Sequence, residues 1–180
     1  MNHYGKRTFE QIDDCIVKVC WLFDKDDKQK FALSYNLICE TLAVETGWGT
    51  IKPADKSPKN IAQIERDTFQ DIKNRSMKHR EKVQVGLGVD ISAVGYEDLA
   101  DEQMAILFCR LFYKLIPTPI PATRWMRGVY WKSYYNTIKG AGTVEHYMRM
   151  CRDILDGGDG EIERGNNKGE TDEKVHTRRI

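Results

Sequence analysis

The chain has 180 residues, of which 41% are hydrophobic and 31% are charged. This balance is ordinary for a soluble protein and excludes a collagen, a coiled-coil rod and a wholly disordered chain. The length fits one compact domain. Lys and Arg together number 28 and Asp and Glu 27, so the formal net charge is +1. We therefore expect no global attraction to nucleic acid or to an acidic membrane.

The sequence carries no sign of membrane insertion or export. No window approaches the ~20 apolar residues that a membrane helix needs, and the first nine residues lack the apolar core of a signal peptide. We expect synthesis in a cytoplasm and, with an odd number of cysteines and no C-x-x-C pair, reduced thiols. The four histidines show no metal-binding spacing, so no metal is expected.

Helix signals begin near the N-terminus. Residues 8–11, T-F-E-Q, form a capping box, with Thr8 as N-cap and the glutamine reaching back. Apolar residues follow at helical spacing as far as Phe23. A second helix is expected over about 29–46, ended by Gly47. The proline- and glycine-containing stretch that follows is typical of a loop.

The middle of the chain gives weaker signals. A short helix is expected over about 67–78, and a basic run lies in or near it: Lys73, Arg75, Lys78, His79, Arg80 and Lys82. Such a run is typical of a solvated helix face, and a contact to a polyanion is the alternative. Residues 84–96 are rich in Gly and Val and predict a loop or a small β-hairpin.

The last third again predicts helices. Residues 99–115 place their apolar side chains on one face, and closely spaced prolines stop that helix. A helix over about 122–136 leads into a glycine turn, after which Thr143 caps a helix to about Leu155. Beyond it the residues are mostly charged or glycine. The sequence therefore predicts one mainly α domain at 1–155 and a flexible, disordered charged tail at 156–180.

Glu45 is the first candidate for chemistry. It falls on the apolar stripe of the second expected helix, close to where that helix ends. Burial and the negative end of the helix dipole both disfavour its ionised form and so raise its pKa. A carboxyl group that is still protonated near neutral pH is what a general acid requires. The alternative is a structural glutamate that turns to solvent or pairs with a lysine.

Two motifs around Glu45 resemble those of the lysozyme-like lytic transglycosylases. The family's E-S-G at a helix end corresponds to residues 45–47, Glu-Thr-Gly, followed by Trp48. Its G-L-M-Q corresponds to residues 60–63, Asn-Ile-Ala-Gln, with the glutamine 18 positions after the glutamate, as in the common form of the family. A threonine, Thr68, stands five residues after that glutamine. Asn60 occupies the glycine position, and Asn tolerates a positive φ better than most residues.

A third motif completes the resemblance, which covers about residues 31–155 and is closer to phage-encoded members. The family's A-Y-N-A-G, followed by a glycine turn and a helix, is similar to residues 134–136 and the turn at 140–142. The resemblance implies a lysozyme-like α fold and cleavage of the β-1,4 bond between N-acetylmuramic acid and N-acetylglucosamine in peptidoglycan. It implies glycan strands as the partner and no cofactor.

The family's roles transfer to matching positions. Glu45 is implied to protonate the glycosidic oxygen and then to take the proton of the sugar's 6-hydroxyl, leaving a 1,6-anhydro product. Gln63 is implied to hydrogen-bond the substrate or orient the acid, Tyr135 to contact the carboxyl or an N-acetyl group, and Asn136 to brace the loop. Each of these three has a structural alternative: a loop-tying amide, helix packing and a C-cap. Thr68 is a further candidate for substrate binding.

Aromatic side chains suit a glycan site because sugar C–H faces stack on rings. Several aromatic residues fall in the segments expected to flank the cleft, and core packing is their alternative role: Trp48, Trp125, Tyr130, Trp131 and Tyr134. Of these, Trp48 follows the catalytic motif directly and is the candidate for substrate binding.

Two other functions remain open. A hydrolytic lysozyme needs a second carboxylate, for which Asp55 is the candidate, although neighbouring lysines make a surface ion pair its alternative. Glu65 and Asp67 are further candidates, at positions that the family does not use catalytically. The other function is a non-catalytic virion structural or adaptor protein that binds glycan or other virion proteins. An open groove at Glu45 favours the enzyme, which without an export signal needs a holin or packaging in a virion to reach the wall.

Overall fold

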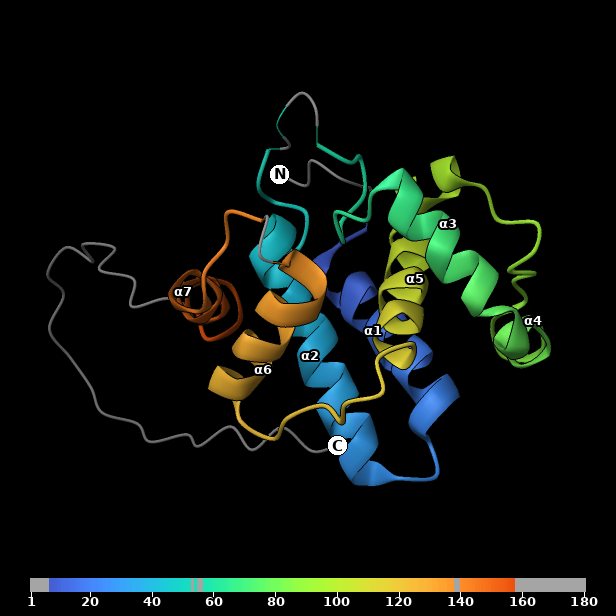
Figure 1. Ribbon diagram of the computed structural model, residues 1–180, viewed down its shortest axis with the longest axis horizontal. Coiled ribbons are helices and arrows are strands. Elements are labelled where there is room, and N and C mark those ends of the chain that lie inside the picture. Colours follow the sequence, from blue (N-terminus) through green and yellow to red (C-terminus); the bar gives the residue numbers. More distant parts are fainter. Residues whose placement is uncertain (1–6, 53, 55–56, 138–139, 158–180) are drawn as a thin grey trace, which may run out of the picture.

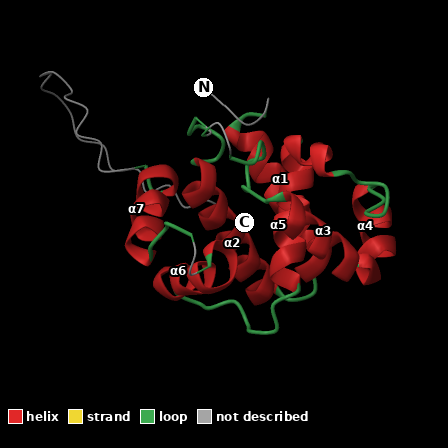
Figure 2. Cartoon of the chain, turned by 45° about the horizontal axis from the view of Figure 1, so that its top comes forward, coloured by secondary structure: helices red, strands yellow, loops and turns green. Residues whose placement is uncertain are grey.

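The computed structural model describes residues 7–52, 54, 57–137 and 140–157. This part of the chain is helical, with no strand (Figure 2). None of its helices is long and apolar enough to cross a lipid bilayer. The α-helices are α1 (Phe9–Asp24), α2 (Lys28–Thr46), α3 (Arg66–Arg75), α4 (Arg80–Leu87), α5 (Glu102–Lys114), α6 (Arg124–Trp131) and α7 (Val144–Leu155). Short 3₁₀-helices at Met77–His79 and Tyr96–Ala100 and a π-helix at Lys132–Asn136 complete the elements.

Helix α2 lies in the middle of the fold, with α1 and α5 on one side and α6 and α7 on the other (Figure 1). Its apolar residues reach into both sides. Leu37, Ile38 and Leu42 belong to the main core, while Val44 packs in a smaller cluster with Tyr147 of α7. The C-terminal end of α2 is therefore enclosed by both groups of helices, which determines the surroundings of Glu45.

Several predicted helix ends are confirmed. Thr8 and Gln11 form the reciprocal capping box at the start of α1. Helix α2 ends at Gly47, whose φ of 52° is the left-handed conformation that glycine adopts without a Cβ clash. Thr143 accepts a hydrogen bond from the backbone N–H of His146 at the start of α7. The five cysteines are all free and buried, as expected.

The hairpin alternative for residues 84–96 is wrong. The first part of that segment completes α4, which Gly88 ends with a φ of 71°. Val83 is fully buried and anchors the helix, and Arg80 forms a two-bonded ion pair with Asp90 that folds the following loop back. Residues 158–180 of the expected tail lie outside the described residues.

The basic run is held largely by local partners. Three of its side chains bond nearby groups: Lys73 to the Val94 carbonyl, Arg75 to Asp71 and Arg80 to Asp90. These contacts favour the interpretation of a solvated helix face over that of a polyanion site.

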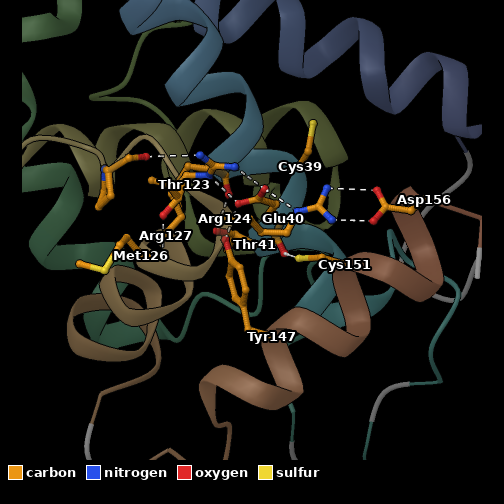
Figure 3. A network of polar contacts seen from close by, with 12 residues as sticks. Cys39, Glu40, Thr41, Thr123, Arg124, Met126, Arg127, Tyr147, Cys151 and Asp156 are labelled. Carbon is orange, nitrogen blue, oxygen red and sulfur yellow. Dashed lines mark hydrogen bonds and ion pairs between the residues drawn. The ribbon is translucent and has the colours of Figure 1, made fainter.

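A buried ion-pair network attaches α6 and α7 to α2 (Figure 3). Glu40, which is 2% exposed, receives two 2.7 Å hydrogen bonds from Arg127 and one of 2.7 Å from the Tyr147 hydroxyl. Arg124 adds a 3.2 Å contact and pairs in turn with Asp156. Because a buried carboxylate is tolerated when it is paired in this way, the network fixes the register of α6 along α2.

Candidate active site

A groove of about 600 Å³ lies at the C-terminal end of α2. Five of the residues selected from the sequence line it together: Glu45, Gln63, Thr68, Tyr135 and Asn136. They come from α2, from the loop before α3, from the first turn of α3 and from the π-helix. The fold thus brings all three sequence motifs to one surface.

The carboxyl group of Glu45 is largely removed from water. One oxygen, Oε1, accepts a 2.9 Å hydrogen bond from the indole N–H of Trp131. Burial raises the pKa of Glu45 to about 7, although the Trp131 hydrogen bond opposes the shift. The other oxygen, Oε2, has no hydrogen-bond partner among the described residues. It is not one of their unpaired polar atoms that are cut off from solvent. Near neutral pH a substantial fraction of Glu45 is therefore protonated, and Oε2 is the oxygen free to carry that proton in a residue that lines the groove.

Beside Glu45, the loop that contains Ile61 and Ala62 is tied to α2 and to the π-helix. The hydroxyl of Thr46 donates a 2.7 Å hydrogen bond to the Ile61 carbonyl, and the hydroxyl of Tyr135 donates one of 2.6 Å to the Ala62 carbonyl. The Tyr135 ring also stacks on Tyr113, with centres 5.4 Å apart. Tyr135 is therefore committed to holding this loop and makes no hydrogen bond to the Glu45 carboxyl in the described structure.

Gln63 has an unusual backbone for its residue type. Its φ is +53°. The motif had suggested a positive φ at Asn60, but the positive φ lies at Gln63 instead. The side chain of Asn60 instead bonds both the N–H and the carbonyl of Ile64 and so closes the turn. The amide nitrogen of Gln63 donates to the carbonyls of Pro58 and Asn60, while its Oε1 has no partner among the described residues. Gln63 therefore ties the loop and still presents an acceptor.

Another part of the lining comes from the end of the π-helix and the turn after it. The ammonium group of Lys132 donates 2.8 Å hydrogen bonds to Asn136 Oδ1 and to the carbonyls of Thr137 and Gly140. Thr137 has φ 63° and ψ 172°, a conformation essentially reserved for glycine. Lys132 thus connects Asn136 to the turn, and the strain falls at a residue that lines the groove. The expectation that Asn136 braces the loop stays a prediction.

Trp131 was expected either to flank the glycan cleft or to pack in the core, and its hydrogen bond to Glu45 was not expected. It is 1% exposed, one turn before Tyr135 on the same face of the α6–π segment. This spacing could have been noticed in the sequence, because a side chain one helical turn before a motif tyrosine lies on the same face of the helix.

Trp48 lies elsewhere. It is 8% exposed, its indole donates to the Cys39 carbonyl, and its ring contacts Phe9, so the structure gives it a packing role.

The candidate second carboxylates differ in position. Asp55 lies outside the described residues. Glu65 is exposed and lines the same groove as Glu45, whereas Asp67 does not line it. The described residues contain no group of three His, Cys, Asp or Glu side chains arranged for a metal ion.

Comparison with known proteins gives no family assignment. The chain matches no protein-family model, no curated protein and no solved structure. Its chemistry therefore has to be inferred from the groove: an acid that holds its proton near neutral pH, beside the free carbonyl oxygen of Gln63 and the carboxylate of Glu65.

Proposed function

We propose that this protein cleaves the β-1,4-glycosidic bond between N-acetylmuramic acid and N-acetylglucosamine in peptidoglycan, as a phage-type lytic transglycosylase on a lysozyme-like fold. The observation that carries the proposal is Glu45, a carboxyl group with a pKa of about 7 in the lining of an open groove. A general acid needs that protonation state and that access to substrate. The open groove also supports the enzyme over a non-catalytic adaptor.

The reaction balances without water or a cofactor. Glu45 transfers the proton on Oε2 to the glycosidic oxygen as the bond from that oxygen to C1 of the muramic acid breaks. The resulting carboxylate then takes the proton of the sugar's own 6-hydroxyl while O6 bonds to C1. The product is a 1,6-anhydro sugar, and Glu45 is protonated again.

The neighbouring groups support these two steps. The Trp131 N–H, already 2.9 Å from Oε1, stabilises the carboxylate that exists between the proton transfers. The free Oε1 of Gln63 accepts a hydrogen bond from a sugar hydroxyl or from an N-acetyl N–H. Asn136 and Lys132 hold the end of the π-helix in place. Each group is held by contacts present before substrate binds, which lowers the cost of organising the site.

A hydrolytic lysozyme is the second candidate, and the position of Glu65 favours it. An inverting hydrolase holds a water molecule between an acid and a second carboxylate about 6.5–9.5 Å apart. Glu65 shares the groove with Glu45 and can serve as that base. Asp55 is the other candidate for the same role.

The deciding experiment is mass spectrometry of purified peptidoglycan digested by the protein and by matched variants. We expect 1,6-anhydro muropeptides from the wild type and from Glu65→Gln, and none from Glu45→Gln. Products with reducing ends that disappear in Glu65→Gln or in Asp55→Asn establish the hydrolase instead. Folded wild-type protein that releases nothing from several wall chemotypes contradicts both enzymes and supports the adaptor.

A further inference from the structure

A second cavity, of about 620 Å³, lies between the start of α2, the end of α5 and the segment at 116–122. We name it the α2–α5 pocket. Its lining includes residues from the start of α2, whereas the groove is lined by Glu45 near the end of α2; Figure 1 draws these two ends of the helix at the bottom and the top. Lys30 lines the pocket, and 15 residues of helix separate it from Glu45, or about 22 Å at 1.5 Å per residue. The two cavities are distinct, and their volumes both suit small ligands.

The acidic residues of this pocket already have partners. Asp24 accepts hydrogen bonds from the Ser34 hydroxyl, at 2.8 Å, and from Arg110 Nη2, at 2.7 Å. Asp27 caps α2 and pairs with Lys30 at 3.3 Å. Lys114, in contrast, forms no ion pair with any described residue, although it lines the pocket. The lining therefore carries three basic side chains, those of Lys30, Arg110 and Lys114, against the two carboxylates of Asp24 and Asp27.

Arg110 adds donors that are not used. Its side chain is 5% exposed, and in the described structure its guanidinium makes one hydrogen bond, to Asp24. A guanidinium has five N–H donors, and Nε of Arg110 is buried without a partner. Leaving buried donors unpaired is costly. Nη1 of Arg110 has no hydrogen bond among the described residues and, unlike Nε, is not one of their buried unpaired atoms, so it is the donor that Arg110 can offer to an anion in the pocket.

Positive charge is concentrated around one ring nearby. The charged groups of Lys82, Arg110 and Lys114 lie 5.7, 5.8 and 5.7 Å from the ring centre of Phe23. Burial, followed by the charge of Arg110, lowers the pKa of Lys114, and the charge of Asp24 opposes this shift only in part. An anion beside Lys114 and Arg110 relieves this repulsion.

The remaining wall is apolar. It is built from Leu33, Ile116, Pro117, Pro119, Ile120 and the ring of Tyr130. We propose that the α2–α5 pocket binds a small molecule with one phosphate or carboxylate group on an aromatic or branched apolar body. The anionic group lies between Arg110 and Lys114, and the body packs on this wall. The proposal is independent of the chemistry at Glu45.

The test uses ¹H–¹⁵N NMR spectra of the full chain titrated with phenyl phosphate and, separately, with benzoate. Benzyl alcohol is the neutral comparator. We expect saturable shifts of the Leu33, Ile116 and Thr118 amides with one or both anions, and the stronger binder identifies the anionic group. Lys114→Met weakens binding by about tenfold or more, and Lys114→Arg restores it. Lys82→Met is the matched control, because Lys82 lies as close to Phe23 but does not line the pocket.

Four results overturn the proposal: no saturable shift at millimolar anion, equal binding of benzyl alcohol, equal weakening by Lys82→Met, or shifts confined to the Glu45 groove. The dispersion of each variant's spectrum reports whether it is folded. If Lys114→Met is unfolded, Ile120→Trp replaces it, since this change fills the pocket and leaves both cations in place. Binding that survives Ile120→Trp also contradicts the proposal.

Discussion

Replacing Glu45 by glutamine is expected to abolish glycan cleavage and, at the same time, to stabilise the protein above neutral pH. Folding raises the pKa of this carboxyl from 4.5 to about 7 because burial disfavours its charge. As the pH rises, the unfolded chain therefore loses this proton at a lower pH than the folded protein does. The folded state becomes less stable relative to the unfolded state. The difference in pKa corresponds to about 3 kcal/mol.

The pH dependence gives this prediction its test. Below about pH 4.5 the carboxyl is protonated in both states, and Glu45→Gln leaves the free energy of unfolding nearly unchanged. Between about pH 4.5 and 7 the wild type loses stability relative to the variant, and above pH 7 the gap is constant at up to about 3 kcal/mol. The glutamine carbonyl can still accept the Trp131 hydrogen bond, so the change removes mainly the ionisable proton.

Denaturant unfolding at pH 4 and pH 8 measures both free energies. Glu65→Gln is the control, because this carboxylate lines the same groove but is exposed; its effect is expected to stay within about 0.5 kcal/mol. A stability difference between wild type and Glu45→Gln that is the same at both pH values refutes the reasoning. So does a variant less stable at pH 8 than the wild type.

Three further changes test the supporting structure. Trp131→Phe removes the N–H that lowers the pKa of Glu45, so the basic limb of the pH–activity profile should move up by about one pH unit; an unmoved limb contradicts this role. Arg127→Met leaves Glu40 without its two-bonded partner and should cost about 3 kcal/mol in thermal unfolding. Thr137→Gly should stabilise by about 1 kcal/mol in denaturant unfolding, since it relieves a positive φ.

The sequence predicted the elements that depend on local chemistry. A threonine N-cap with a glutamine three residues later, or a glycine after the last apolar residue, acts within one turn, so the start of α1 and the end of α2 were readable. Residues 80–87 were harder. Gly and Val lower helix propensity, and α4 forms there because Val83 is buried in the core and Arg80 binds Asp90.

The sequence predicted several of the residues that line the groove, but not the contacts that they make. The sequence placed Glu45 near a helix end by its spacing and selected Gln63 by its resemblance to a family motif, and the fold brings the two into one groove. Sequence alone did not reveal that Trp131 supplies the hydrogen bond to Glu45, because that contact joins residues 86 positions apart. Nor did it place Trp48 in the core, since packing against Phe9 depends on the path of α1.

The π-helix at the end of α6 gives the wall of the groove that it lines tolerance to a change in chain length. A π-turn accommodates one residue more than an α-turn, so deleting Ser133 would let α6 continue as a regular helix. Each residue of an α-helix advances by about 100° around the axis. Because the π-turn takes up one extra residue, the residues that follow such a deletion would keep about the same direction around the axis. Loss of one codon at this point is thus a change in length that this wall of the groove can absorb while the helical scaffold keeps its register.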